Sequence, residues 1–283
     1  MMFTLPQPSG GFRWAQLPPG PALICEALEP LCLHFFTARP WRLGERTPDS
    51  TDGWLEIAQT MEIDVERVRR LHQIHGAQPV TYKKGEQAPA SGIPRADIVL
   101  TDDPAVAVVV QTADCLPILI ADRRTSAVAA AHAGWRGLAV RVPEVVVNRM
   151  AAGFGSRPED LAVAIGPAIG ACCYEVGADV RERFVREGFS PAQVARWFHQ
   201  EPLTLPGNPP MRSLSAERRA DHWFFDGWAC AREQLESAGV PGAQVFGVDL
   251  CTGSHEAVFC SYRRDGAIAG RMAAVIRPRP LPH

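Results

Sequence analysis

The pattern of apolar and polar positions divides the chain into short strands and helices. Several runs of β-branched and aliphatic residues are bounded by polar or turn residues, which is typical of buried strands. The predicted strands lie within 22–37 and at 106–110, 116–120, 126–131, Leu161–Ile165 and 244–248. Alanine fills much of 126–131, so composition favours that strand least.

Segments of helical composition alternate with these strands. They lie at 52–60, 64–70, 138–150, 175–187 and 226–235. Acidic residues that can cap a helix precede the first two, and Asp226 is the predicted cap of the last. Proline costs about 3 kcal/mol inside a helix but is tolerated at its first position. The segment 138–150 therefore begins a helix near Pro143 or kinks there.

The stretch 111–137 carries the chemistry around which the chain is organised. It reads Gln-Thr-Ala-Asp-Cys-Leu-Pro at 111–117 and His-Ala-Gly-Trp-Arg-Gly at 132–137. We interpret it as a strand that arrives at Cys115, a second strand that returns, and a glycine-flanked turn that presents His132 and Arg136. Cysteine thiolate and neutral imidazole are ligands that zinc selects.

A third ligand is expected in Leu-His-Gln-Ile-His-Gly at 71–76. His75 precedes Gly76, which permits a close backbone approach. One cysteine and two histidines would leave the fourth position of a catalytic zinc open for water or substrate. A buried cysteine and two hydrogen-bonded histidines would explain the same residues without a metal. We interpret His72 as a neighbour of the site and not as a ligand.

Composition narrows the class of protein. The chain has 283 residues, of which 46% are hydrophobic and 21% charged, and its net charge is −2. The chain therefore has no overall positive electrostatic field that would attract nucleic acid. The sequence has no apolar run of about 20 residues that would span a membrane and no apparent signal peptide, so a cytoplasmic protein with no membrane contact is expected. Its eight cysteines are spread along the chain and are expected to be reduced thiols.

Five motifs in order resemble the YfiH/YlmD family, also described as laccase-domain proteins, polyphenol oxidases, purine nucleoside phosphorylases and the peptidoglycan editing factor. The motifs are Gln-Ile-His-Gly at 73–76, Thr-Ala-Asp-Cys-Leu-Pro at 112–117, His-Ala-Gly-Trp-Arg-Gly at 132–137, Ile-Gly-Pro-Ala-Ile-Gly at 165–170 with Cys-Cys-Tyr-Glu-Val-Gly at 172–177, and Ser-Tyr-Arg-Arg-Asp-Gly at 261–266. The resemblance spans about residues 30–276.

The resemblance implies one α+β domain over 1–283, with mixed β-sheets in layers flanked by helices. The proline-rich segment 188–220 is then an irregular excursion within the domain, because the family pattern resumes after it. The resemblance also implies that His75, Cys115 and His132 bind one catalytic zinc. The implied activities are phosphorolysis of adenosine, inosine and methylthioadenosine, and deamination of adenosine.

Further residues are candidates for supporting roles. Asp114 would orient a ligand histidine or support the cysteine turn, and Arg136 would offset the charge of phosphate. Arginine forks bind phosphate bidentately. Arg39, Arg263 and Arg264 are therefore candidate phosphate ligands. The alternatives are a surface position for Arg39 and an internal salt bridge with Asp265 or another acid for the other two.

Three other functions fit parts of the pattern. A metal-free Cys115/His132 hydrolase acting on cell-wall precursors would use a thiolate beside an imidazole. A non-catalytic structural zinc protein would close the fourth coordination position. A multicopper oxidase needs roughly ten histidines, whereas this chain has eight and no His-x-His pair, so the sequence gives copper little support.

Overall fold

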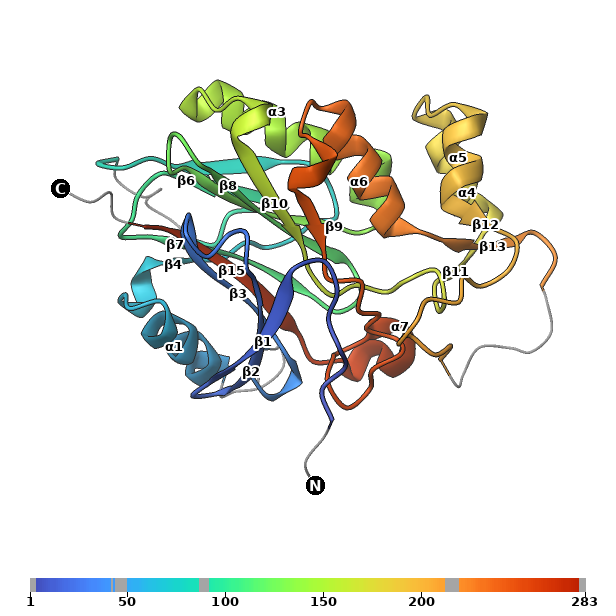
Figure 1. Cartoon of the computed structure of the whole chain (residues 1–283), viewed down its shortest axis with the longest axis horizontal. Coiled ribbons are helices and arrows are strands. Elements are labelled where there is room, and N and C mark those ends of the chain that lie inside the picture. Colours follow the sequence, from blue (N-terminus) through green and yellow to red (C-terminus); the bar gives the residue numbers. More distant parts are fainter. Residues whose placement is uncertain (1–3, 42, 44–49, 87–91, 212–218, 280–283) are drawn as a thin grey trace.

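The computed structural model describes residues 4–41, 43, 50–86, 92–211 and 219–279, apart from the side chains of 50–52. Two six-stranded sheets pack face to face, and helices cover their outer faces (Figure 1). A small three-stranded sheet lies to one side of this sandwich, at the right of Figure 1. Among the described residues, no helix has the length and apolarity needed to cross a membrane.

The first sheet places the last strand of the chain at its centre. Its order is β1 (Phe12–Leu17), β2 (Gly20–Cys25), β3 (Cys32–Thr37), β15 (Met272–Pro278), β7 (Ala107–Thr112) and β4 (Val68–Arg69). All pairs are antiparallel except β4 with β7. Because β15 pairs with both β3 and β7, the C-terminal part of the chain joins the N-terminal strands to the central stretch.

The second sheet is also mixed, and the third is antiparallel. The second has the order β14 (Val245–Gly247), β10 (Leu161–Ile165), β8 (Leu116–Asp122), β9 (Val128–Ala133), β6 (Ile98–Thr101) and β5 (Pro79–Tyr82). Its end pairs, β14 with β10 and β5 with β6, are parallel. The third sheet has the order β11 (Glu175–Gly177), β13 (His222–Phe225) and β12 (Phe198–His199).

The longer helices form the outer layers. The α-helices are α1 (Ser50–Thr60), α2 (Trp135–Ala139), α3 (Val142–Phe154), α4 (Ala178–Arg186), α5 (Pro191–Trp197), α6 (Gly227–Ser237) and α7 (Tyr262–Asp265). The short 3-10 helices are η1 (Arg39–Trp41), η2 (Val65–Arg67), η3 (Pro158–Asp160), η4 (Gly242–Gln244) and η5 (Gly266–Ile268). α3 and α6 cover the second sheet, whereas α1 packs on the first.

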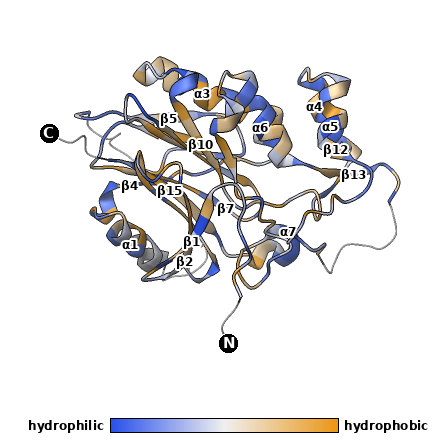
Figure 2. Cartoon of the chain, in the orientation of Figure 1, coloured by the Kyte–Doolittle hydropathy of each residue, from blue (hydrophilic) through white to orange (hydrophobic). Residues whose placement is uncertain are grey.

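Strand β8 shows why the central strands are apolar throughout. Its side chains alternate between faces: Ile118 and Ile120 pack toward the helices, whereas Leu119 packs between the sheets. Both faces are covered, so every residue of β8 is buried, and the strands at the centre of the molecule are largely hydrophobic in Figure 2. The neighbouring β9 carries alanines opposite these bulky residues, for example Ala131 opposite Ile118, which lets α3 approach closely.

The predicted strands are present. The predictions made from sequence patterns were wrong where two short elements follow each other directly. The segment 64–70 forms η2 and the strand β4 instead of a helix, because its last residues pair in parallel with β7. The segment 175–187 begins as strand β11 and becomes helical only at Ala178. The helix after 138 is divided: α2 ends at Ala139, and α3 starts at Val142 with proline in its first turn, as one of the two alternatives predicted.

The prediction that 188–220 is irregular was wrong for its first part. Ser190 and Gln193 form a capping box that starts α5, and β12 follows directly. Residues 212–218 of this segment lie outside the described residues. The predicted cap of α6 is confirmed, since the Asp226 side chain accepts a hydrogen bond from the Ala229 amide at 2.9 Å. The side chain of Asp52, a predicted cap of α1, also lies outside the described residues.

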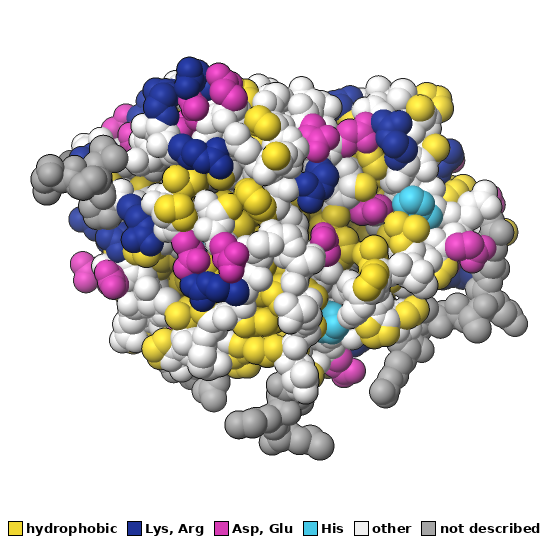
Figure 3. Space-filling model, viewed as in Figure 1, with side chains coloured by type: hydrophobic (Ala, Val, Ile, Leu, Met, Phe, Trp, Pro, Cys, Tyr) yellow, Lys and Arg dark blue, Asp and Glu magenta, His cyan; other side chains and the backbone are white. Residues whose placement is uncertain are grey.

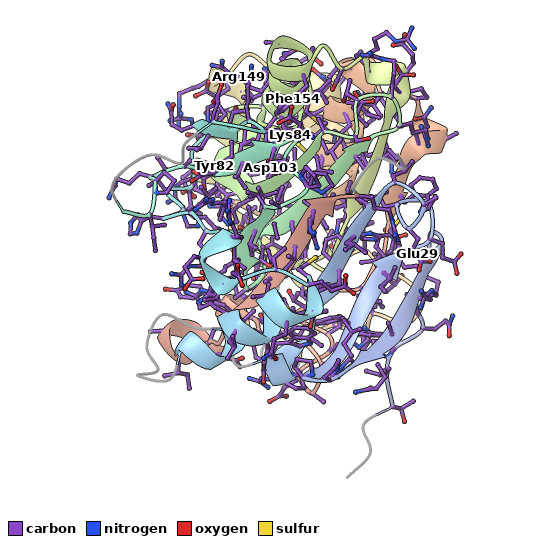
Figure 4. The ribbon with its side chains drawn as sticks, turned by 90° about the vertical axis from the view of Figure 1, so that its left-hand side faces the viewer. Glu29, Tyr82, Lys84, Asp103, Arg149 and Phe154 are labelled. Atoms are coloured by element: carbon purple, nitrogen blue, oxygen red, sulfur yellow. The ribbon has the colours of Figure 1, made fainter. Side chains whose placement is uncertain are left out.

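The surface is charged with both signs. Lys and Arg side chains are interspersed with Asp and Glu over the face in Figure 3, as expected for a net charge near zero. A quarter turn shows Arg149 and Phe154 of α3 at one end of the molecule and Glu29 at the side formed by the first strands (Figure 4). Tyr82, Lys84 and Asp103 gather where β5 and β6 end, and there the Lys84 amide donates to the Asp102 carboxylate at 2.7 Å.

Candidate metal centre

The three predicted zinc ligands lie together, although they come from distant parts of the chain. The ligand atoms of His75, Cys115 and His132 are all within 4.8 Å of one another. The two imidazole rings meet edge to face, with centroids 4.9 Å apart and an interplanar angle of 82°. His75 is exposed, Cys115 is half-buried and His132 is buried, so the group reaches from the core to the surface.

Strand register explains how Cys115 and His132 meet. β8 and β9 are antiparallel, with Leu116 opposite Ala133 and Pro117 opposite His132. Cys115, in the turn before β8, therefore faces Gly134, the residue after β9. A Cβ atom on Gly134 would lie 2.8 Å from Cys115 Sγ and 3.4 Å from His75 Cδ2, so only glycine leaves room for the three donors. His132 is thus the penultimate residue of a strand and does not lie in the predicted turn.

Asp97 holds both histidines, and it is the residue that sequence reasoning missed. Its carboxylate lies 2.9 Å from Nδ1 of His132 and accepts the amides of His75 and Gly76 at 3.0 and 2.7 Å. The side chain is fully buried. Burial opposes its ionisation, but the hydrogen bonds from His132 and the two amides outweigh this effect and lower the pKa of Asp97. The sequence offers one sign of this role, because Asp97 is an acidic residue directly before the apolar strand β6.

The loop that carries His75 is fixed by a second set of bonds. The side-chain amide of Gln73 donates to the Gln111 carbonyl at 2.7 Å and accepts from the Gln111 amide at 2.7 Å. His75 itself has a φ of 58°, a left-handed conformation that a non-glycine residue adopts only when its surroundings impose it. His75 therefore lies in a loop tied to the end of β7.

Asp114 supports the cysteine turn, the second of its two predicted roles. Its carboxylate accepts a hydrogen bond from the Thr252 hydroxyl at 2.5 Å and from the Arg263 amide at 2.6 Å. These bonds hold Asp114 at a φ of 93°. They also join the turn before Cys115 to the C-terminal motif. Burial raises the pKa of Asp114, although both hydrogen bonds oppose the shift.

Electrostatics favour a thiolate at the centre. Burial opposes ionisation of Cys115, but the charge and hydrogen bonding of His132, with a contribution from His75, lower its pKa to about 6. Burial also opposes protonation of His132, whereas Cys115 and Asp97 raise its pKa to about 9. In the absence of a metal the pair is therefore a thiolate and an imidazolium at neutral pH. A bound cation would take the place of the imidazolium proton.

The centre opens into a cleft of about 690 Å³. Its lining combines aromatic rings, cations and the three candidate ligands. The lining residues are Leu71, His72, Gln73, His75, Gln111, Thr112, Ala113, Asp114, Cys115, His132, Trp135, Arg136, Tyr174, Tyr262, Arg263 and Arg271. This volume lies within the range of small-molecule sites. His72 lies in the cleft but outside the group of three donors, as predicted.

The structure places the four predicted arginines in two different environments. Arg136 and Arg263 line the cleft, where they stack over the rings of Trp135 and Tyr174 at 4.3 and 4.9 Å from the ring centroids. Arg39 and Arg264 do not line it. Both bind the carboxylate of Asp265, and Arg264 also donates to two backbone carbonyls. Arg264 therefore forms an internal salt bridge with Asp265, which was the alternative to phosphate binding. Arg39 binds the same carboxylate and does not line the cleft.

The donor set fits a zinc ion. Two imidazoles and one thiolate with an exposed side are the ligands of an open tetrahedral site. Blue-copper sites add a weak axial methionine in most cases. Among the described residues that line the cleft, none is a methionine. Within the described ranges, two groups of three residues have donor atoms close enough for a metal, and only this one contains histidine.

Comparison with known proteins assigns the chain to a family. The family described as "Multi-copper polyphenol oxidoreductase laccase" matches residues 52–279. Purine nucleoside phosphorylase YfiH of Escherichia coli (strain K12) is 37% identical over 206 residues, which cover 73% of this chain and 72% of that protein. The chain belongs to the YfiH/YlmD family.

Other relatives agree. Purine nucleoside phosphorylase YlmD of Geobacillus stearothermophilus is 33% identical over 242 residues, which cover 84% of this chain and 81% of that protein. The crystal structure of YlmD from this organism aligns with a TM-score of 0.77 at 28% identity, covering 96% of this chain and 100% of that one. YfiH of Bacillus licheniformis aligns equally well, with a TM-score of 0.77 at 25% identity and 94% of this chain covered. The predicted α+β fold of the YfiH/YlmD family is therefore confirmed.

Proposed function

We propose that this protein is a zinc-dependent purine nucleoside phosphorylase that cleaves adenosine, inosine and methylthioadenosine. The observation that carries the proposal is the meeting of His75, Cys115 and His132 in a cleft that also presents arginines. The purine nucleoside phosphorylase names of the relatives support the same reaction class. We further propose that the protein acts in the cytoplasm, where free thiols such as its eight cysteines stay reduced.

Three side chains would hold one zinc ion. Because Nδ1 of His132 faces Asp97, its Nε2 is the atom left for the metal. The thiolate of Cys115 and the ring of His75 complete the set. When bound, zinc would supply a Lewis acid that lowers the pKa of water toward neutrality and polarises an oxygen of phosphate or substrate.

The cleft walls provide the contacts that a nucleoside and phosphate need. The rings of Tyr174 and Trp135 line the cleft and would contribute apolar surface beside a bound purine. The guanidinium groups of Arg136 and Arg263 lie over these rings, and Arg271 lines the same cleft. Phosphate bound to these cations would be oriented for attack on the ribose C1′ as the purine leaves, and the cations would stabilise the charge that develops.

The same cleft supports a second proposed activity, deamination of adenosine. This reaction needs water in place of phosphate next to the purine. The exposed side of the centre, at His75, leaves access for either nucleophile. The products separate the two reactions, because phosphorolysis of adenosine yields adenine and ribose 1-phosphate, whereas deamination yields inosine.

One observation favours a second candidate function, that of a thiol hydrolase. The Cys115 thiolate beside the His132 imidazolium is the arrangement of a cysteine nucleophile and its base. The His75→Ala variant decides between the two functions, since a metal-free hydrolase does not need this residue. We expect the variant to lose its metal and phosphorolysis of adenosine, measured as adenine released in phosphate buffer. Full release of adenine by the metal-free variant would contradict the zinc centre, whereas metal-free hydrolysis of a cell-wall precursor by this variant would support the hydrolase.

A further inference from the structure

A second group of sulfur ligands lies apart from the candidate metal centre. Cys172 and Cys173 are in the turn after β10, and Cys251 is in the loop after β14. Their three sulfur atoms are all within 4.8 Å of one another. Each of the three residues has an exposed fraction of 0%. Residues almost 80 positions apart in the chain thus bring three thiols to one buried point.

Polar groups surround these sulfurs. Sγ of Cys172 and Sγ of Cys173 are 3.5 Å apart, and the Ser254 hydroxyl is 3.6 and 3.5 Å from them. The Gly170 amide donates to Sγ of Cys251 at 3.2 Å. The Ser254 hydroxyl and the Gly170 amide are therefore placed to donate hydrogen bonds to a thiolate sulfur, which apolar packing alone does not offer.

One sulfur separation in the cluster is close to that of a metal thiolate site, and the other two are within 4.8 Å. In a tetrahedral site with Zn–S bonds of about 2.3 Å, two sulfurs are separated by about 3.7 Å. The separation between Cys172 and Cys173 is close to this value. Cys230 shows the contrast within the same apolar core: it is equally buried, but its sulfur accepts a hydrogen bond from Gln234 and belongs to neither ligand group.

We propose that Cys172, Cys173 and Cys251 bind a thiophilic d10 cation, Zn²⁺ or Cu⁺, as a second and structural metal site. Soft thiolates select these two ions. The three thiols release their protons as the metal–sulfur bonds form. With Zn²⁺ the site carries a net charge of −1, which the Gly170 amide offsets, and the Ser254 hydroxyl is the nearest oxygen for a fourth position.

The three cysteines are completely buried, which indicates a structural site, since structural metal sites are closed whereas catalytic ones keep an open position. A bound cation would fasten the β10 turn to the loop after β14. Tyr174, which follows Cys173, lines the cleft, and Thr252, which follows Cys251, binds the cleft residue Asp114. The site would therefore brace the wall on which the substrate is proposed to bind, but its existence does not depend on the reaction catalysed.

The test uses the full chain with the Cys115→Ser substitution, which disables the first centre. The protein is produced separately with zinc or copper, purified under reductant and analysed by mass spectrometry of the metal. We expect about one Zn²⁺ or one Cu⁺ per chain to remain. The identity of the retained ion shows whether the site binds zinc or copper. Adding Cys251→Ser should remove it, whereas adding Cys230→Ser, the matched buried control, should not.

X-ray absorption at the metal edge provides a readout that needs no change in the cluster. The Cys115→Ser protein should show three sulfur neighbours around the remaining ion. A metal-free Cys115→Ser protein, or a remaining ion without sulfur neighbours, would overturn the proposal. So would a denatured, unreduced wild-type chain that lacks two titratable thiols, because the cluster would then be a disulfide pair.

Discussion

Asp97 lies 2.9 Å from His132 and at the same time accepts the backbone amides of His75 and Gly76. One buried carboxylate thus fixes two candidate ligands that reach the centre from different segments. It favours the His132 tautomer that carries the proton on Nδ1 by accepting a hydrogen bond from it, and it holds the loop in which His75 adopts a left-handed conformation. The geometry of the centre therefore depends on a residue that does not contact the proposed metal.

Replacing Asp97 with Asn should weaken metal binding by about 10- to 100-fold, because the Asn side chain has one accepting oxygen and cannot accept hydrogen bonds from both His132 and the two backbone amides as a carboxylate does. Competition with a chromogenic chelator measures this affinity, and adenosine phosphorolysis should fall with it. Asp226→Asn is the matched control: it alters another carboxyl that binds a backbone amide, and asparagine remains a good helix cap. Equal metal affinity in the Asp97→Asn and wild-type proteins would contradict the role of Asp97.

Adding one methyl group at Gly134 should disrupt the centre while leaving the fold in place. The new Cβ of Gly134→Ala would lie 2.8 Å from Cys115 Sγ, so the thiolate must move away from the histidines. We expect metal affinity and phosphorolysis to fall together. Gly153→Ala in α3 provides the control, because its Cβ meets no atom within 4 Å and should add up to about 1 kcal/mol of stability. An active, metal-loaded Gly134→Ala protein would show that the donor geometry is not as described.

The adjacent arginines of the last motif should have separable effects. Arg263 lines the cleft, so Arg263→Met should raise the KM for phosphate about tenfold or more through the loss of charge-assisted hydrogen bonds. Arg264 is bound to Asp265 and two carbonyls, so Arg264→Met should cost about 2 kcal/mol of stability and leave that KM unchanged. Initial rates at varied phosphate and urea unfolding measure the two effects. The reverse assignment would place the phosphate site elsewhere.

His34 should make the protein less stable in acid. The side chain is buried between β2 and β3, where its Nε2 accepts the Cys25 amide, and burial lowers its pKa to about 4. Below about pH 6.5 the unfolded chain takes up a proton that the folded chain does not, so stability falls as the pH falls toward 4. From about pH 7 to about pH 4.5 this loss is about 2 to 3 kcal/mol.

Urea unfolding of the wild type and His34→Gln over this pH range isolates the contribution of His34, because the other titrating groups are common to both proteins. The variant should be less stable at neutral pH but should lose less stability on acidification. Parallel pH profiles for the two proteins would show that His34 titrates normally.

Local sequence patterns predicted the strands of the central stretch because both faces of those strands are covered and their runs are apolar throughout. The same logic could not place β15 at the centre of the first sheet, since strand order depends on pairings between distant segments. It also missed α5, although the Ser190 and Gln193 capping box was present in a segment that its prolines made irregular.

The candidate ligands illustrate the same division. Residue types pointed to Cys115, His132 and His75 as candidates, and the family resemblance implied that the three bind one metal ion. Their contact results from the register of β8 with β9 and from the absence of a side chain at Gly134, neither of which is visible in composition. Asp97 was missed because a single acid before a strand has no pattern of its own, and only the folded chain brings His132 to it.

The most direct test of the account removes and restores the metal. The purified protein is stripped with a chelator, returned to zinc or to copper, and supplied with adenosine and phosphate while the products are separated by chromatography. We predict no turnover in the stripped protein, and adenine with ribose 1-phosphate after zinc alone is restored. Phosphorolysis that persists in the stripped protein, or returns only with copper, would contradict a zinc centre formed by His75, Cys115 and His132.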